Sequence, residues 1–214
     1  MGKKKILKIF LIIIALIFII FLVHTIRNFI IITDLQSKIA KYSDNKNHHI
    51  KIISNQENGT TLTTNYYKKN NKKAVFIERN LNGEIVKLSI YDDGENNHTY
   101  TETTTEKIAS LNSGFIEVQI YNGTETDNLL QKMLSSMVAN IKTVNENGKK
   151  YYKLSNINST YSIIAKNQYV LVDSDTGLLY KSLDNYSTIE REYDFNNVDD
   201  SVFTEPDISE YKTQ

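Results

Sequence analysis

The chain has 214 residues, with 25 lysines and arginines, 25 aspartates and glutamates, and no cysteine. The lack of cysteine excludes disulfides, thiolate metal sites, cysteine nucleophiles and acylated-cysteine anchors. Five of the cations and none of the acids precede residue 28, which leaves 20 cations against 25 acids, a net charge of −5. A mildly acidic body argues against binding a phosphate backbone, so we expect no nucleic-acid partner.

The N-terminal segment is apolar from residue 6 to residue 23, with Lys8 as its one charged residue. As a helix, these eighteen residues would extend over about 27 Å, close to the roughly 30 Å hydrocarbon core of a bilayer. A cleaved secretory signal is the alternative, because residues 3–5 are lysines. The run exceeds the roughly 7–15 apolar residues of such signals, and no small-x-small cleavage site follows it. We therefore predict an uncleaved transmembrane anchor.

The lysines before the apolar run also predict the orientation of the anchor. Cytoplasmic flanks carry the excess of lysine and arginine, so the N-terminus is expected in the cytoplasm. The expected organisation is a cytoplasmic arm at residues 1–5, an anchor and juxtamembrane segment at 6–32, and an extracytoplasmic α+β domain at 33–214. The protein is therefore expected in the cell membrane as a single-pass protein. Its richness in lysine, isoleucine and asparagine indicates an AT-rich, bacterial genome.

After the apolar run, Thr33 or Asp34 is expected to cap a short helix that ends at Tyr42, with Leu35 and Ile39 on one face. Alternating and β-branched segments then predict strands, separated by turn signals such as Asn58-Gly59 and Asn82-Gly83. The predicted strands are residues 50–52, 60–69, 74–78, 84–91, 97–105, 115–121, 150–154, 161–166, 168–173, 178–183 and 189–195.

Two of these segments alternate cleanly between apolar and polar residues. In 84–91, Val86, Leu88 and Ile90 share one face, the pattern of a half-buried strand. In 115–121, the apolar side chains of one face alternate with two polar ones. The apolar set is Ile116, Val118 and Ile120, and the polar set is Glu117 and Gln119.

One helix is predicted between the strands, at residues 127–141, with Thr126 or Asp127 as its cap. Its apolar residues form one broad stripe. They are Leu129, Leu130, Met133, Leu134, Met137, Val138 and Ile141. Such a stripe forms plain core, or it lines an adaptable cavity because methionine repacks easily.

About ten short strands and two helices indicate an α+β fold. We predict an N-terminal transmembrane helix followed by a curved antiparallel sheet, an unclosed β-barrel, packed on one or two helices. Curvature or partial closure would limit the exposed edges of so large a sheet.

We find no catalytic, cofactor-binding or metal-ligating set of residues in the sequence. His48 and His49 are adjacent on a predicted strand, so their side chains point to opposite faces and are poorly placed to share a metal ion. The string from Asp173 to Gly177 contains one Asp-Thr-Gly triplet, whereas an aspartic protease needs two carboxylates from two such triplets or from a dimer. It also lacks the spacing of a calcium loop. We interpret it as a tight turn between two strands.

The C-terminal third carries a pattern of strands and turns that resembles a known superfamily. It runs through residues 169–173, the Asp175-Thr176-Gly177 turn, and residues 178–182, 193–198 and 206–211. This pattern is similar to the lipoprotein-carrier (LolA/LolB-like) superfamily, over about residues 34–211. The resemblance implies a curved antiparallel half-barrel with helices against its concave side and a cavity for acyl chains. The chain departs from the carriers because it is tethered and has no cysteine anchor.

These observations favour a non-enzymatic protein that binds a hydrophobic ligand or a lipidated partner at the membrane. The expected partners are the membrane itself, a lipid, acyl chain or lipoprotein, and a membrane protein. An envelope protein-interaction or stress-sensing module is the first alternative. A hydrolase is the remote one, and it would need paired carboxylates in a cleft. The residues expected to line the cavity are Val86, Leu88, Ile90, Met133 and Met137.

Overall fold

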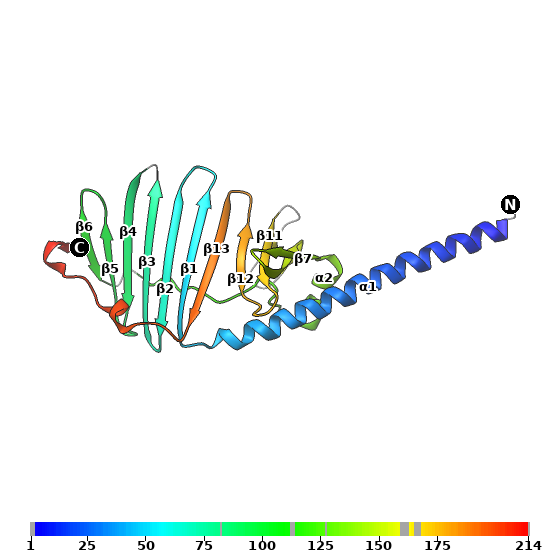
Figure 1. Cartoon of the computed structure of the whole chain (residues 1–214), viewed down its shortest axis with the longest axis horizontal. Coiled ribbons are helices and arrows are strands. Elements are labelled where there is room, and N and C mark those ends of the chain that lie inside the picture. Colours follow the sequence, from blue (N-terminus) through cyan, green and yellow to red (C-terminus); the bar gives the residue numbers. More distant parts are fainter. Residues whose placement is uncertain are drawn as a thin grey trace. The chain divides into compact units, whose positions relative to one another are not determined.

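The structure is a computed structural model of the chain (Figure 1). It describes residues 3–81, 83–111, 114–126, 128–158, 163–164 and 168–213. The chain divides into two compact units, which are described one at a time. Unit 1 comprises Met1–Ile39 and Tyr121–Leu178, and unit 2 comprises Ala40–Ile120 and Leu179–Gln214.

The first element is a continuous helix, α1, which runs over Lys3–Ser43. The prediction that Thr33 or Asp34 caps a separate helix is wrong, because both residues lie within α1. No glycine or proline interrupts the chain after the apolar run, so nothing in the sequence stops the helix there. Four buried positions spaced by four, three and four residues form one face of its later turns, which packs within unit 1. They are Asn28, Ile32, Leu35 and Ile39.

Among the residues that the structure describes, the apolar run of α1 is not buried. The helix is long and apolar enough to cross a membrane, and none of its most apolar eighteen-residue window is buried. An anchor and a signal sequence both have this property. Burial in a core therefore does not account for the run, as expected from its uniformly apolar sequence.

Unit 1 contains a second helix, α2, at Leu129–Val138. Asn128 caps it, because its side-chain oxygen accepts a hydrogen bond of 2.8 Å from the Gln131 backbone N–H. The predicted helix was too long at its C-terminal end. Ala139 has an extended backbone, and Ile141 belongs to the following strand.

The strands of unit 1 form a small antiparallel sheet in the order β7-β8-β11, and a short two-stranded pair. Their bounds are β7 Asn140–Glu146, β8 Lys149–Ser155, β11 Tyr169–Asp173, β9 Ile157–Asn158 and β10 Ile163–Ile164. Strand β7 was missed from the sequence, because its first residues continue the apolar spacing of α2.

Unit 2 contains the large sheet, in the order β14-β6-β5-β4-β3-β2-β1-β13-β12. Neighbouring strands from β6 to β12 are antiparallel, whereas β14 lies parallel to β6. The order begins at an edge strand and does not return to it, so the predicted α+β class with an unclosed antiparallel sheet is confirmed. The bounds are β1 Asn47–Gln56, β2 Thr61–Lys69, β3 Lys72–Leu81, β4 Glu84–Asp92, β5 Asn97–Glu102, β6 Lys107–Leu111, β12 Leu179–Leu183, β13 Ser187–Phe195 and β14 Lys212–Thr213. Two short 3-10 helices, η1 Asp200–Phe203 and η2 Ile208–Glu210, precede β14.

The core of unit 2 lies on one face of this sheet. Its fully buried members come one from each of four neighbouring strands, β1 to β4, and they are Ile50, Tyr66, Val75 and Ile90. Regular alternation along each strand places them on a common face. The apolar face predicted for residues 84–91 is therefore the core face of β4.

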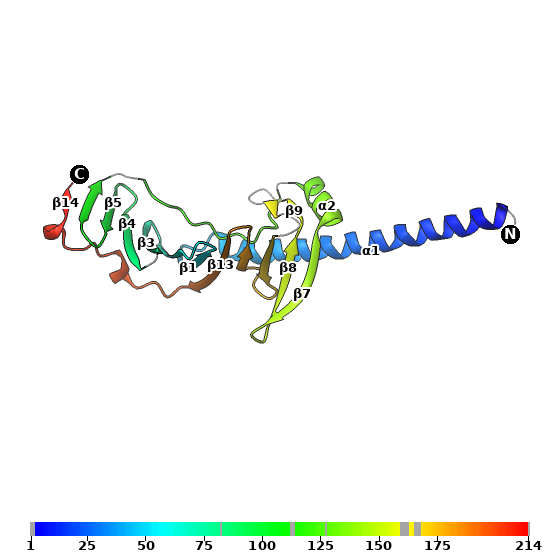
Figure 2. The same ribbon diagram turned by 90° about the horizontal axis from the view of Figure 1, so that it is seen from above.

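An extended segment, residues 114–120, covers this core, and we call it the strap. Figure 2 shows it running along one face of the strands of unit 2. The prediction of a strand at 115–121 is wrong, because the strap is not part of the hydrogen-bonded strand ladder. Its side chains also depart from the predicted alternation. Phe115, Val118 and Ile120 pack on the core, whereas Ile116 is 44 % exposed.

Some predicted features lie wholly or partly outside the described residues. These are the first residue of the Asn82-Gly83 turn, the alternative cap Asp127, and most of the predicted strand at 161–166. The described part of that strand is β10.

The arrangement of the strap predicts unequal effects of two neighbouring substitutions. Phe115→Ala should lower the free energy of unfolding by about 1–2 kcal/mol, because a half-buried ring loses its contacts with the core. Ile116→Ala should change it by less than about 0.5 kcal/mol, because that side chain is exposed. Urea unfolding of the full chain in detergent micelles measures both. A larger loss for Ile116→Ala would mean that the strap alternates like a regular strand.

Candidate functional site

The strap is held at its centre by the carboxylate of Glu117. Tyr66 of β2 donates its hydroxyl to Glu117 Oε1 at 3.1 Å. The ammonium of Lys73, from β3, lies 2.9 Å from Glu117 Oε2, and that of Lys68 lies 3.7 Å from Oε1. Lys73 also lies 3.6 Å from the Asp92 carboxylate. One strap side chain is therefore tied to two strands of the sheet by charge-assisted contacts.

These contacts shift the ionisation of the groups involved. Burial alone would raise the pKa of Glu117, but the hydrogen bonds from Lys73 and Tyr66 and the lysine charges outweigh it, so this pKa lies below its usual range. The hydrogen bond to Glu117 raises the pKa of Lys73. Burial, reinforced by Glu117, raises the pKa of the Tyr66 hydroxyl. Near neutral pH the strap is thus held by an ionised carboxylate.

His48 lies on the same face of β1, beside the ring of Tyr66 at 5.7 Å between centroids. Its Nδ1 lies 2.8 Å from the Asn45 carbonyl oxygen, and its buried Nε2 has no hydrogen-bond partner among the residues that the structure describes. Burial lowers the pKa of His48, so the ring is neutral at pH 7. The neighbouring His49 stacks on Tyr67 at 4.2 Å. The two histidines therefore face opposite sides of the strand, as predicted. Within the described ranges, no group of three or more His, Asp or Glu side chains is arranged to hold a metal ion.

The residues predicted to line an apolar cavity belong to two units. Leu88 and Ile90 join the core cluster under the strap, and Val86 is half-buried on the same strand, β4, of unit 2. Met133 and Met137 lie one turn apart on α2 of unit 1, and both are exposed. The structure therefore brings Leu88 and Ile90 together with the strap residues Phe115, Val118 and Ile120.

The expectation that the Leu/Met stripe of α2 forms plain core is wrong. All of its members on the helix are exposed, whereas Ser135 and Ser136 on the other side are buried. The polar side faces inward because Asn28 of α1 donates from its amide to the carbonyl oxygens of Ser136 at 3.1 Å and Ala139 at 2.8 Å.

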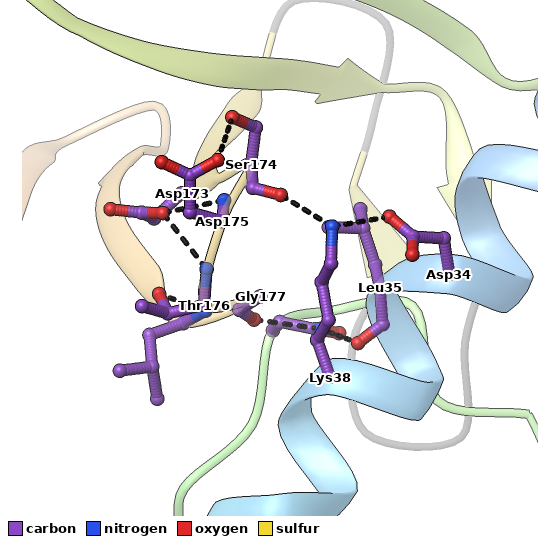
Figure 3. A network of polar contacts seen from close by, with 10 residues as sticks. Asp34, Leu35, Lys38, Asp173, Ser174, Asp175, Thr176 and Gly177 are labelled. Carbon is purple, nitrogen blue, oxygen red and sulfur yellow. Dashed lines mark hydrogen bonds and ion pairs between the residues drawn. The ribbon is translucent and has the colours of Figure 1, made fainter.

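The loop with the Asp-Thr-Gly triplet is a tight turn, as predicted (Figure 3). The Asp173 carboxylate accepts hydrogen bonds from the backbone N–H groups of Asp175 at 2.8 Å and Thr176 at 3.0 Å. The Gly177 N–H closes the turn by donating to the Asp173 carbonyl oxygen at 2.9 Å. This is the local hydrogen bonding by which aspartate stabilises turns. The carboxylate of Asp173 is thus used structurally.

The same turn packs on α1 within unit 1 (Figure 3). Lys38 donates to the Ser174 carbonyl oxygen and pairs with Asp34, both at 2.6 Å. Gly177 has a φ of +74°, and a Cβ at this position would lie 2.8 Å from Lys38 Cβ and 3.0 Å from the Leu35 carbonyl oxygen. The buried amide of Asn122 bridges the carbonyl oxygens of Leu35 and Gly177. Only glycine fits this approach of turn and helix.

A polar hollow of about 550 Å³ lies beside the Glu117 cluster in unit 2. Lysines supply three of its lining side chains, two of which also contact Glu117. The full lining is Ser43, Asp44, Lys46, Lys68, Asn70, Asn71, Lys73 and Gly94. Lys68 and Lys73 are paired with Glu117, Lys46 adds a third ammonium group, and Asp44 is the one carboxylate in this lining.

Sequence reasoning did not identify Glu117, Lys68 or Lys73. Glu117 was predicted on the polar side of a strand, so its contact with the sheet was not anticipated. The lysines carried a weak signal: Lys68 is two residues from buried Tyr66, and Lys73 is two residues from buried Val75. Alternation places both on the core face of the hairpin.

No family model matches the chain, and no curated protein matches it closely enough to be counted. Solved structures do match. One is the crystal structure of MucB in complex with MucA(peri), at 15 % identity and a TM-score of 0.34, covering 79 % of this chain and 58 % of that one. The chain thus spans 58 % of the length of MucB.

Another match is a LolA superfamily protein from Nitrosomonas europaea, at 11 % identity and a TM-score of 0.26, covering 79 % of this chain and 97 % of that one. Because both TM-scores lie below 0.5, we draw no functional conclusion from either match.

The contact between the Asp173 turn and α1 predicts that Gly177→Ala lowers the free energy of unfolding by about 3 kcal/mol. Positive φ costs an alanine about 1–2 kcal/mol, and the new Cβ collides with the helix. Gly148→Ala is the matched control, because Gly148 also has a positive φ but has no atom within 4 Å of its would-be Cβ. Gly148→Ala should lower the free energy of unfolding by only about 1–2 kcal/mol, the cost of the positive φ alone. Equal losses in urea unfolding would show that the turn does not pack closely on α1.

The low pKa of Glu117 predicts that its contribution to stability depends on pH. Glu117→Gln should lower the free energy of unfolding by about 1 kcal/mol at pH 7, where the carboxylate is ionised. The native state stabilises the ionised form of Glu117 more strongly than the unfolded state does. The difference between wild type and variant should therefore shrink as the pH falls from about 4.3, the ordinary pKa of glutamate, through the lower native pKa. Denaturant titrations at pH 7 and pH 3.5 measure this difference. A difference that stays constant would contradict the assignment.

Proposed function

We propose that the chain is a single-pass membrane protein whose domain outside the membrane binds an apolar chain, as a lipid or as part of a lipidated partner, without catalysing a reaction. The exposed apolar run of α1 supports the anchor. The lysines before the run support a cytoplasmic N-terminus and an extracytoplasmic domain from about residue 33. Residues 1–5 would then form the cytoplasmic arm, and 6–32 the anchor and juxtamembrane segment.

The strap carries the binding part of the proposal. It covers the apolar face of the sheet with Phe115, Val118 and Ile120, yet it adds no strand to the ladder. A ligand with an acyl chain would take the place of these three side chains, with Leu88 and Ile90 beneath it. The strap would be displaced when its own apolar contacts are replaced by those of the ligand.

The lysine-lined hollow gives the proposed ligand a second contact. Lys68 and Lys73 release their contacts with Glu117 when the strap leaves, and they would then pair with an anionic group of the ligand. Lys46 lines the same hollow. An amphipathic anion therefore suits the site, with its apolar part on the sheet and its charge in the hollow.

The cavity residues predicted from the sequence enter this proposal in part. Leu88 and Ile90 would contact the ligand directly, and Val86 would extend the same face along β4. The role of Met133 and Met137 as cavity residues stays a prediction.

The experiment measures binding of an octanoylated peptide to the full chain in nanodiscs, with empty nanodiscs as the background. A spin label at Ile116→Cys reports the strap, because this position is exposed and the chain has no other cysteine. Saturable binding and a more mobile label are expected. Glu117→Gln should tighten binding about fivefold, because releasing the strap then costs about 1 kcal/mol less.

The matched controls separate the competing functions. The same peptide without its octanoyl group should not bind. Equal binding of both peptides would favour a protein-interaction module without an apolar ligand. Absence of saturable binding, or binding that leaves the label immobile, would contradict the proposed site.

A further inference from the structure

Helix α2 has the opposite arrangement to a helix of a water-soluble domain. Its large apolar side chains are between 38 % and 67 % exposed, and they lie on one face. They are Leu129, Leu130, Met133, Leu134, Met137 and Val138. Its inward side holds the buried Ser135 and Ser136 and the half-buried Gln131 and Lys132. In a soluble domain the apolar stripe would face the core. The exposed face of α2 is therefore suited to an apolar environment outside the chain.

The contacts of α2 place it directly beyond the apolar run of α1. The carbonyl oxygen of Ala139 lies 3.2 Å from His24 Nε2 and 2.8 Å from Asn28 Nδ2. Towards the other end of α2, the Lys132 ammonium lies 5.9 Å from the centre of the Phe29 ring. Residues 24–29 cover a rise of about 7.5 Å along α1, starting one residue after the run ends. These contacts of α2 with α1 therefore all fall on residues 24–29, just after the run ends.

The charges around α2 suit the same zone. Leu129–Val138 contains one charged residue, Lys132, and no acid. Arg27, on the adjacent turn of α1, donates to the Ile141 carbonyl oxygen at 3.0 Å. Basic side chains beside an apolar helix face are typical of helices that lie in a membrane interface and attract anionic lipids.

We propose that α2 is an interfacial helix, whose apolar face enters the outer leaflet of the membrane that α1 crosses. The inference rests on the proposed membrane anchor. A lipid surface is the occupant that the observations favour, because Ile26 and Ile30 continue the exposed apolar surface of α1 to the level of α2. With a second attachment beside the anchor, unit 1 cannot rotate about the axis of α1 and keeps a fixed face towards the membrane.

The absence of cysteine allows single spin labels on the full chain in nanodiscs of phosphatidylcholine and phosphatidylglycerol. Leu134→Cys tests the exposed face of α2. Ile14→Cys reports the anchor, and Asn145→Cys on β7 is the exposed control from the same unit. The readout is the ratio of collision rates with oxygen, which concentrates in lipid, and with a water-soluble nickel complex. We expect this ratio to be several-fold higher at Leu134→Cys and Ile14→Cys than at Asn145→Cys.

The three labels distinguish failure of this inference from failure of the anchor. A lipid-like ratio at Ile14→Cys with a water-like ratio at Leu134→Cys would overturn the interfacial helix and leave the anchor intact. A label at Leu134→Cys shielded from both reagents would overturn it as well, because a protein surface, such as a second copy, would then cover α2. A water-like ratio at Ile14→Cys would overturn both proposals together.

Discussion

The fold of unit 1 depends on the side chain of Asn28, which is fully buried in the middle of α1. Its amide donates to the carbonyl oxygens of Ser136 and Ala139, where α2 ends and its last carbonyls have no partner within the helix. A buried amide is stable only when it is hydrogen-bonded, so this pairing fixes which face of α2 turns inward. The polar side of α2 therefore faces Asn28, and the apolar side is exposed.

A comparable constraint operates in unit 2, where one face of a large sheet has to be covered. The strap covers this face with three apolar side chains. Because the strap adds no strand-to-strand hydrogen bonds, its attachment to the sheet relies on side chains. Glu117 supplies the polar part of that attachment through Tyr66 and Lys73. Because such contacts at a partly exposed site contribute only about 1 kcal/mol, most of the attachment of the strap comes from its three apolar side chains.

Most of the large sheet could be predicted from the sequence, since β1 to β4 combine alternating side chains with asparagine and glycine turns at their ends. The core face of β4, with Leu88 and Ile90, was predicted for the same reason. The strap could not be, because alternation indicates an extended chain and says nothing about whether a neighbouring strand is present. The contact of Glu117 with the sheet was missed for the same reason, because Glu117 lies on the strap. Its partners on the hairpin of β2 and β3 lie more than forty residues away in the sequence, and charge patterns carry no information on such long-range pairs.

The helix at α2 shows a different limit of sequence patterns. A stripe of leucine and methionine at helical spacing establishes that one side of the helix avoids water, and in a soluble domain only the core can receive that side. In a chain that also crosses a membrane, lipid is a second apolar medium, so the same stripe is compatible with facing outward. What decides between the two is the opposite side of the helix, where Ser135 and Ser136 are buried and the Ser136 carbonyl oxygen accepts a hydrogen bond from Asn28 of α1. The small and polar positions of an amphipathic helix near an anchor are therefore the better guide to its orientation.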